Sequence, residues 1–357
     1  MFRGKKIKYL MFMGLALALA GSLVAGACAP AAPEEVAEEV EVYRWEPAVW
    51  INAGTPYDYL VYFSENVNAA SDGRIVSTPS AVGAVCPAEE LMEAVSAGTT
   101  GAMLPTPSYY AGKVPLAAVF NTSIGLPTWV HQANCYEVFQ DGRAFELYQE
   151  VMEGIYNVEI IHERIGPMNI IISASCPIDD ITFLDGMKFR CGDDHLAGPL
   201  NTLGASTVWA PGSEIYTMLA TGVVDAFTYG SSYDHYGMGF HEVTSHWLYS
   251  PSIMPSANEQ FVVNRDVWNG MADDLKAVVL NALDAAQYRS ATEGEYLIAS
   301  AWKDVAAYGI ELVTWPEGDY AVWVAAQVEW MGQYEDDPAV AEFIQIVNDY
   351  GVFMGYL

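Results

Sequence analysis

Basic side chains are scarce in this sequence. The 357 residues include 15 Lys and Arg against 45 Asp and Glu, which gives a net charge of -30. Arg3, Lys5, Lys6 and Lys8 precede every acid, so the chain from Cys28 onward holds 11 basic and 45 acidic residues and carries -34. A charge of this sign and size repels phosphate backbones and anionic membrane surfaces, which excludes nucleic acid as a partner. It favours solubility and, as one hypothesis, a saline habitat.

Catalytic motifs are also missing. No Gly-x-Ser-x-Gly turn presents a nucleophile, and no glycine-rich pattern indicates a nucleotide site. His235, His241 and His246 follow Asp234 closely, but their spacings of six and five residues do not place the imidazoles on one helix face. Ordinary surface or helix-end histidines are the simpler interpretation. An exported metal-dependent hydrolase that uses this cluster is kept as an alternative function.

Cysteine is rare as well, with five in the chain. The spacings match no zinc motif. If the body of the protein is exported, its oxidising surroundings allow one or two disulfides, although a body of this size does not require them. Free buried thiols are the alternative for these four cysteines: Cys86, Cys135, Cys176 and Cys191.

The N-terminus has the pattern of an export signal. A basic stretch up to Lys8 leads into 19 uncharged, mostly apolar residues, Tyr9–Ala27. The sequence VAGAC, which ends at Cys28, resembles a loose lipobox in which Ala25 replaces the more typical leucine. We therefore predict a signal peptide over residues 1–27 and a lipidated Cys28. Plain secretion and a retained membrane anchor are the alternatives, and all three place the body outside the cytoplasm.

The export signal is followed by a tether and a folded body. Residues 28–42 are rich in Ala, Pro and Glu and lack aromatic residues, as in a flexible linker. Elsewhere the composition is that of a globular protein, with 52% hydrophobic and 13% aromatic residues in the chain. Roughly 330 residues correspond to about two domains.

Turn signals and apolar patterns predict an α/β body. Strands alternate with helices over residues 43–166, which favours parallel strands, and the same order returns over residues 168–251 as a second lobe. The helix over residues 273–307 is long enough to reach from one lobe to the other. Further strands are predicted at 43–45, 75–78, 169–173, 187–191, 207–209 and 261–264, and further helices at 57–70, 88–96, 195–203 and within 319–357.

Arg190 is notable because it is one of few basic residues in an acidic body and lies in the apolar strand that begins at Met187. A guanidinium is the natural partner of a carboxylate, since two donors match two oxygens. From the residues alone, an ordinary salt bridge to one of the many acids is the alternative.

A set of motifs occurs in a characteristic order from residue 43 to residue 315. It resembles the extracytoplasmic solute-binding proteins of tripartite ATP-independent periplasmic (TRAP) transporters, and is most similar to the 2-oxo-acid or "mannitol/chloroaromatic" branch. The motifs are Ser71–Ile75 (SDGRI), Ala94–Gly98 (AVSAG), Ser108–Lys113 (SYYAGK), Pro115, Asp185–Arg190 (DGMKFR), Leu203–Ala205 (LGA), Glu214–Ala226 (EIYTMLATGVVDA) and Phe261–Trp268 (FVVNRDVW).

The resemblance implies a fold and a division of the chain. The fold is a two-lobed, clamshell-like α/β binding protein with hinge strands and a long helix that spans both lobes. We expect lobe I to comprise residues 43–167 and 255–295, and lobe II residues 168–254 and 296–357. Glu214 and Asp225 are interpreted as a helix-start carboxylate and a turn former.

The resemblance also implies ligand-binding residues. In that family the arginine that closes the Gly-x-Lys-x-Arg motif binds the ligand carboxylate, and Arg190 occupies this position. The family's neighbouring aromatic residue is matched by Tyr229. Ordinary core packing is the alternative for each of the candidate cavity walls: Trp50, Tyr109, Trp209, Tyr229 and Met254, with Asn264 as a polar member.

Metal binding is a point of departure from the 2-oxo-acid branch. There, carboxylate or amide side chains hold a metal ion beside the substrate, whereas the matching positions here are Thr228, Met254 and either Met168 or Asn169. No acid occupies them, and a hard cation needs several oxygen ligands. We therefore expect no metal or other cofactor, and a cleft more apolar than those of the relatives.

The resulting expectation is a receptor without bond chemistry. It would bind a small organic acid outside the cytoplasm and deliver it to the membrane subunits of a TRAP transporter, with contact to the membrane through the lipid anchor only. A sensory ligand-binding module is a further alternative. The C-terminal aromatic residues serve either a homodimer or packing against their own lobe: Trp315, Trp323, Trp330 and Tyr334.

Overall fold

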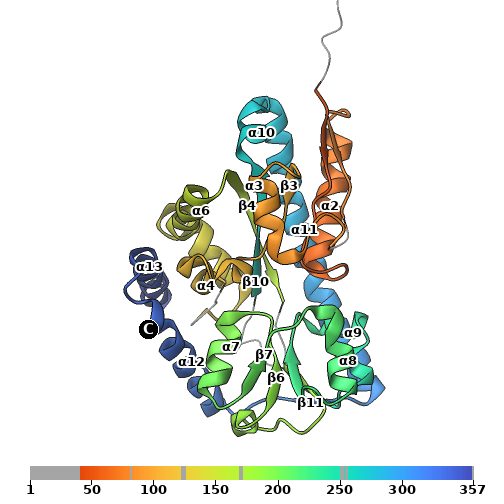
Figure 1. The fold of residues 1–357 in the computed structure, drawn as a ribbon, viewed down its shortest axis with the longest axis vertical. Coiled ribbons are helices and arrows are strands. Elements are labelled where there is room, and N and C mark those ends of the chain that lie inside the picture. The colour runs from red at the N-terminus through yellow and green to blue at the C-terminus, as the bar shows by residue number, and fades with distance from the viewer. Residues whose placement is uncertain are drawn as a thin grey trace, which may run out of the picture. The chain divides into compact units, whose positions relative to one another are not determined.

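The computed structural model describes residues 41–80, 83–121, 126–168, 172–249, 253 and 256–355. The chain divides into two units, Met1–Glu41 and Val42–Leu357. The second unit contains the helices and strands described below (Figure 1). The predicted signal peptide and the lipidation site at Cys28 lie outside the described residues. Within the described residues, no helix combines the length and the apolar character needed to span a bilayer.

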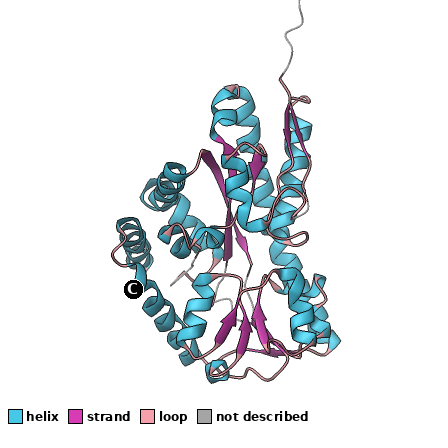
Figure 2. Ribbon diagram, in the orientation of Figure 1, coloured by secondary structure: helices cyan, strands magenta, loops and turns pink. Residues whose placement is uncertain are grey.

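Lobe I is built on a three-stranded sheet in the order β3-β10-β4 (Figure 2). Its central strand, β10, runs antiparallel to both neighbours. The strands predicted over residues 43–166 do run parallel to one another, since β1 pairs with β2 in parallel and both β3 and β4 are antiparallel to β10. The antiparallel pairing was not predicted, because β10 enters this sheet from lobe II and not through a local strand-helix-strand crossover. Its strands are β3 (Ala102–Met103), β4 (Val158–Pro167) and β10 (Ser256–Asn264), beside a parallel pair, β1 (Tyr43–Trp45) and β2 (Ile75–Ser77).

The helices of lobe I cover this sheet because their apolar faces are buried against it. In α2, for example, Tyr59, Leu60, Phe63 and Val67 recur at helical spacing and are all buried. The helical segments are α2 (Thr55–Ala70), η1 (Ala88–Glu90), α3 (Leu91–Ser96), η2 (Pro107–Tyr110), α4 (Pro115–Phe120), α5 (Trp129–Ala133), η3 (Asn134–Val138), η4 (Phe139–Gly142), α6 (Arg143–Ile155) and α10 (Arg265–Gly270).

Lobe II is built on a six-stranded mixed sheet in the order β11-β9-β5-β8-β6-β7. Strand β6 is parallel to β7 and β8, whereas β5 is antiparallel to β8 and β9. The strands are β5 (Ile172–Ala174), β6 (Lys188–Arg190), β7 (Ser206–Val208), β8 (Ala226–Thr228), β9 (His246–Leu248) and β11 (Glu311–Val313). The helical segments are η5 (Ile181–Leu184), α7 (Asp194–Thr202), η6 (Gly212–Glu214), α8 (Ile215–Ala220), α9 (Ser232–Gly237) and η7 (Phe240–Glu242).

One long helix, α11 (Asp273–Tyr308), connects the lobes. It packs against α2 and β4 of lobe I and against α9 of lobe II. Acidic residues in its first turn and Gly309 in the left-handed conformation after its last turn mark its ends. The prediction of a helix that spans both lobes is confirmed.

The C-terminal segment packs within its own chain. Trp315 and Trp323 are buried in the core of lobe II, whereas α13 lies against α4 and α6 of lobe I through Val340 and Phe343. The structure thus places the end of the chain on lobe I, although the sequence analysis assigned it to lobe II. The segments are α12 (Glu317–Met331), η8 (Gly332–Tyr334) and α13 (Pro338–Met354).

The cysteines of the body are free thiols. Cys135 and Cys191 are buried, and burial raises the pKa of Cys135 to about 12 and that of Cys191 to about 11. Both are therefore neutral and unreactive at physiological pH. The two half-buried cysteines are Cys86 and Cys176.

Candidate functional site

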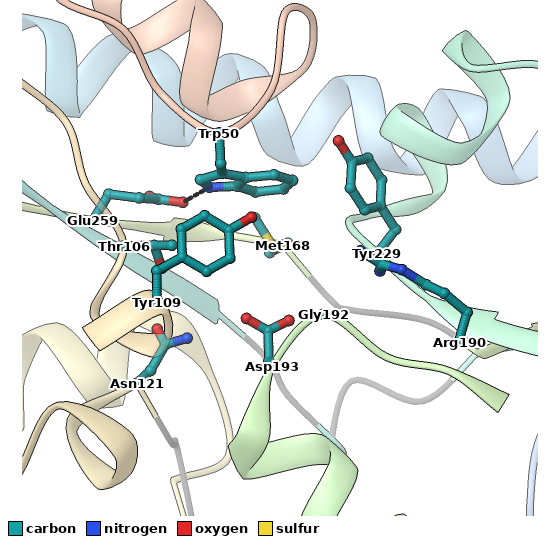
Figure 3. Close-up of a pocket in the computed structure, with 10 residues that line it drawn as sticks. All are labelled: Trp50, Thr106, Tyr109, Asn121, Met168, Arg190, Gly192, Asp193, Tyr229 and Glu259. Carbon is teal, nitrogen blue, oxygen red and sulfur yellow. Dashed lines mark hydrogen bonds between the residues drawn. The ribbon is translucent and has the colours of Figure 1, made fainter. Parts of the chain in front are cut away.

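A cavity lies between the two lobes, and its wall contains residues from both (Figure 3). Lobe I contributes the loop before α2, helix η2, the end of α4 and strand β10. Lobe II contributes the end of β6, the start of α7 and the residue after β8. The space between these residues, including the part that is open to solvent, is about 370 Å³. The lining residues are Trp50, Thr106, Tyr109, Asn121, Met168, Arg190, Gly192, Asp193, Tyr229 and Glu259.

Arg190 is the last residue of β6, and its side chain is held by backbone carbonyls. The residue is 3% exposed. Its Nε and Nη2 donate to the carbonyl of Ala210, and Nη1 donates to the carbonyl of Thr228 at 2.6 Å. A guanidinium has five N–H donors, so one remains on each terminal nitrogen. Those two donors are available to an acceptor outside the protein.

Gly192 permits this position of Arg190. A Cβ atom at Gly192 would lie 2.8 Å from Nη2 of Arg190, closer than atoms pack. The backbone after β6 therefore approaches the guanidinium because residue 192 has no side chain. The same feature leaves the cavity side of Arg190 open.

An aromatic wall borders Arg190. The guanidinium carbon lies 5.4 Å from the ring centroid of Tyr229, within cation–π range. The ring of Trp50 meets Tyr229 edge-on at a centroid distance of 5.1 Å. Burial raises the pKa of the hydroxyl of Tyr229, and burial does the same for Tyr109 on η2. Both phenols are therefore neutral donors and acceptors, and they add no charge to the cavity.

Gly212 gives Tyr229 its space, and this contact leads to a prediction. A Cβ atom at Gly212 would lie 2.4 Å from Cζ and Oη of Tyr229. We expect Gly212→Ala to displace the ring from the wall and to weaken ligand binding by about 1–3 kcal/mol. Titration calorimetry measures the loss. The control is Gly237→Ala, where a Cβ has nothing within 4 Å. Equal affinities of the two variants would contradict a role for Tyr229.

A buried ion pair supports the opposite wall. Arg164 on β4 and Glu259 on β10 are 0% and 1% exposed, and Nη1 lies 2.9 Å from Oε2. The other oxygen of Glu259 accepts from Nε1 of Trp50 at 3.1 Å, so the pair also fixes the indole. Nε and Nη2 of Arg164 are buried and have no hydrogen-bond partner among the described residues.

Asp193 occupies an unusual position at the start of α7. It is the N-cap residue, where an aspartate normally accepts a backbone N–H of the first turn, but its side chain makes no such bond. Its backbone carbonyl accepts from Leu196 and Ala197 instead. The carboxylate points into the cavity (Figure 3).

The structure brings together five of the predicted ligand-binding residues. They come from separate parts of the sequence and line one cavity. Core packing was the alternative for Trp50, Tyr109 and Tyr229, and an ordinary salt bridge was the alternative for Arg190. These residues are Trp50, Tyr109, Met168, Arg190 and Tyr229.

Three other predicted residues lie outside this lining. Thr228 is buried behind the wall, where its hydroxyl donates to Sγ of Cys191 and its carbonyl holds Arg190. Trp209 is 55% exposed. Asn264 caps α10, accepting from the amides of Asp266 and Val267, and donates to carbonyls at the end of α3. The remaining two predicted residues, Asn169 and Met254, lie outside the described residues.

Five lining residues were missed by the sequence analysis, and two of them are acids. The cleft was expected to be apolar, but Asp193 and Glu259 both face it. Glu259 lies two residues before Phe261 in β10. Residues two apart in a strand point to the same face, and this spacing was the signal that could have identified Glu259. Asp193 follows the strand that ends in Arg190. The other missed residues are Thr106, Asn121 and Gly192.

The three histidines of the alternative hydrolase hypothesis make separate contacts and do not face one another in a common site. His235 is buried, bonded to the hydroxyl of Ser173 at 2.9 Å, and burial lowers its pKa well below the usual value. His241 stacks on Tyr236. His246 forms an ion-pair contact with Glu311 on β11. They do not form a joint site, and among the described residues no group of three or more His, Cys, Asp or Glu can hold a metal ion.

Similar proteins were found by sequence and by structure. The sequence model of one protein family, the bacterial extracellular solute-binding proteins of family 7 (DctP), matches residues 49–337. A monocarboxylate 2-oxoacid-binding periplasmic protein from Nostoc is 24% identical over 294 residues, which cover 81% of this chain and 78% of the relative.

Solved structures of TRAP solute-binding proteins share the fold. One from Bordetella bronchiseptica, with calcium and picolinate bound, has a TM-score of 0.79 at 19% identity and covers 88% of this chain and 93% of its own. One from Pseudoalteromonas atlantica, with sodium and pyruvate bound, has a TM-score of 0.77 at 21% identity, with 88% and 96% covered. One from a marine metagenome, specific for pyroglutamate, has a TM-score of 0.75 at 17% identity, with 87% and 99% covered.

Two of these structures contain a metal ion as well as a ligand, but the described residues of this cavity do not fit one. Both oxygens of Glu259 are already hydrogen-bonded, to Trp50 and Arg164. The carboxylate of Asp193 and the buried, unpaired Oδ1 of Asn121 then remain in the described lining, whereas a hard cation requires more oxygen ligands than these two side chains provide.

Proposed function

Because the chain belongs to the bacterial extracellular solute-binding proteins of family 7, we propose that it captures a small organic acid and delivers it to the membrane subunits of a TRAP transporter. A member of this family is an extracytoplasmic solute receptor and not an enzyme. Its mechanism is therefore binding and release, and its specificity is decided by the groups that line the cavity.

The observation that carries the organic-acid assignment is the geometry of Arg190. Three of its N–H groups are bound to backbone carbonyls, which fixes the plane of the guanidinium before any ligand arrives. The two remaining donors belong to a buried cation that lines a cavity. A permanent charge in such a place favours an anionic ligand, and the fork favours a carboxylate.

The relatives support the same class of ligand. The Nostoc protein binds monocarboxylate 2-oxo acids, and the solved structures contain picolinate, pyruvate or pyroglutamate. Each of these is a small carboxylic acid. Trp50, Tyr109, Met168 and Tyr229 would contact the rest of such a molecule, and Thr228 would act through its carbonyl by holding Arg190.

Closure of the lobes explains how a receptor of this kind retains its ligand. Arg190 and Tyr229 come from lobe II, whereas Trp50 and Tyr109 come from lobe I. A ligand that contacts both sets stabilises the closed arrangement by its difference in affinity for the closed and open forms.

A thermal-shift screen tests the proposed function. A ligand that binds the native state raises the melting temperature of the purified protein, so aliphatic, aromatic and 2-oxo carboxylates are compared. Stabilisation by at least one of them is expected. A flat response to the whole set would contradict the assignment to organic acids.

We also propose that the protein is exported and lipid-anchored through Cys28. The support is the signal-like segment over residues 1–27 and the tether over residues 28–42. In a bacterial host, Cys28→Ser is expected to abolish lipid labelling and to release the protein from the membrane fraction. Mass spectrometry of the mature N-terminus measures the outcome. Unchanged membrane association of the variant would contradict lipidation and would favour a retained anchor.

We also propose homodimerisation through the end of the C-terminal helix, where apolar side chains are exposed. The aromatic residues Trp315 and Trp323 are buried within the chain and are not available to a partner. The last turn of α13 leaves Val352 and Phe353 exposed, the latter at 74%. Light scattering of the wild-type protein and of Phe353→Glu tests this surface, since a monomeric wild-type protein would contradict it.

A further inference from the structure

The polar groups of the cavity do not match a ligand that carries a carboxylate alone. Arg190 and Asp193 have opposite charges and line the same space, and no ion pair joins them in the described part of the chain. The charge of Glu259 is balanced by Arg164. The groups of the site therefore sum to zero before a ligand enters, and a plain carboxylate would leave one negative charge unbalanced in a buried space.

Two acceptors in the cavity lack donors. The carboxylate of Asp193 makes no hydrogen bond to any described residue, although it could have capped α7. Oδ1 of Asn121 is buried without a hydrogen-bond partner among the described residues, and Asn121 is 3% exposed. An ionised carboxylate accepts hydrogen bonds and cannot donate them, so the missing partner of Asp193 must be a donor.

No side chain of the described lining donates a hydrogen bond to the carboxylate of Asp193 in this structure. Nε1 of Trp50 is committed to Glu259. Three N–H groups of Arg190 are committed to carbonyls, and the other two are needed for the ligand carboxylate. A buried acceptor without a partner, such as Oδ1 of Asn121, is costly, and native proteins seldom leave one unsatisfied. Asp193 is half-buried, and its carboxylate faces the same cavity.

We propose that the ligand is a small carboxylate that also carries an N–H donor, with its carboxylate on Arg190 and its donor on Asp193 and Oδ1 of Asn121. A zwitterionic amino acid or a cyclic amide acid has this chemistry. This inference rests on the proposed function, because it takes the carboxylate on Arg190 as given. It adds that the site discriminates against acids without a donor, which would leave Asp193 unpaired.

Matched ligand pairs test the proposal in the purified wild-type protein. Calorimetric titration compares proline with its ring-oxygen analogue tetrahydrofuran carboxylate, pyroglutamate with its lactone analogue, and leucine with the corresponding 2-oxo acid. At least one donor-bearing member is expected to bind about 10- to 100-fold more tightly than its partner, the value of a hydrogen bond to a charged group. The proline and pyroglutamate pairs distinguish a charged donor from a neutral one.

Two substitutions at the start of α7 locate the donor-binding group. Asp193→Asn is expected to reduce the preference for the donor-bearing member about tenfold or more, because the variant gains a competing donor and loses the charge. Asp194→Asn is the matched control, since Asp194 is the next residue, is exposed and has the same charge. That variant should keep the wild-type ratio.

The outcomes separate this inference from the proposed function. Equal or tighter binding of the donor-free acids, or an unchanged ratio in Asp193→Asn, would overturn the inference and leave the carboxylate receptor intact. A donor-free acid that binds only with Na⁺ or Ca²⁺, with this dependence lost in Asp193→Asn, would overturn it in favour of a cation at Asp193. If no acid of either kind binds, the proposed function fails as well.

Discussion

Replacing Arg190 with alanine is expected to weaken binding of the organic acid by about 2–5 kcal/mol, which is roughly 30-fold to several thousand-fold in Kd. The loss is large because the variant leaves a desolvated carboxylate without its two donors. Arg190→Lys should fall between the wild type and the alanine variant, since an ammonium keeps the charge but does not form the planar fork. Titration calorimetry with any acid found in the thermal-shift screen measures all three.

The control for Arg190 is Arg289→Ala. Arg289 lies on α11, is about half exposed, and forms ion pairs with Glu65 and Glu293 on the surface. Its removal should leave ligand affinity unchanged and should alter stability by less than about 1 kcal/mol. Wild-type affinity in Arg190→Ala, with a circular dichroism spectrum that shows a folded protein, would contradict the assignment of Arg190.

Breaking the buried pair beneath the cavity is expected to have the second large effect. Glu259→Gln leaves Arg164 as a buried charge without a counter-ion, which costs about 3–5 kcal/mol of stability. At roughly 2 °C per kcal/mol for a protein of this size, the melting temperature without ligand should fall by about 5–10 °C. Differential scanning calorimetry measures this change.

Two further variants show whether the cost comes from the unpaired charge. The double variant Arg164→Met with Glu259→Gln removes both charges and should recover much of the lost stability, because a buried pair is often replaceable by neutral groups of similar size. Glu65→Gln breaks an exposed pair and should change the melting temperature little. A double variant less stable than Glu259→Gln would contradict this account of the pair.

Features that depend on local sequence were predicted well. The strand at Tyr43–Trp45 is observed at the predicted residues, and the long helix predicted over residues 273–307 is observed over Asp273–Tyr308. Each follows from a pattern within its own segment. The strand is a short run of strand-forming residues, and the helix has apolar residues at helical spacing without proline. Arg190 was selected because it is one of few basic residues in an acidic body and because of the motif around it, and the structure places it in the lining of the cavity.

Features that depend on distant pairings were not predicted. The antiparallel sheet of lobe I joins β10 to strands about 100 to 160 residues earlier in the chain, and no local pattern specifies that register. The same separation hides the pairing of Glu259 with Arg164, which are 95 residues apart. Asp193 has the sequence context of an ordinary helix cap, and only the three-dimensional structure places its carboxylate in the cavity.

The position of Thr228 illustrates a further limit. The sequence identified the residue, but its contribution to the site is made by the backbone carbonyl that holds Arg190, while its hydroxyl faces Cys191. A sequence motif specifies which residue occupies a position. It does not specify whether the side chain or the main chain acts there.

The central claim is that Arg190 recognises a carboxylate, and the most direct measurement compares acids with their methyl esters. Each ester keeps the shape of the acid but removes the charge and the second equivalent oxygen. We expect the acids that raise the melting temperature of the purified protein to lose this effect on esterification, and we expect Arg190→Ala to respond to neither form. Equal stabilisation by an acid and its ester would contradict the claim.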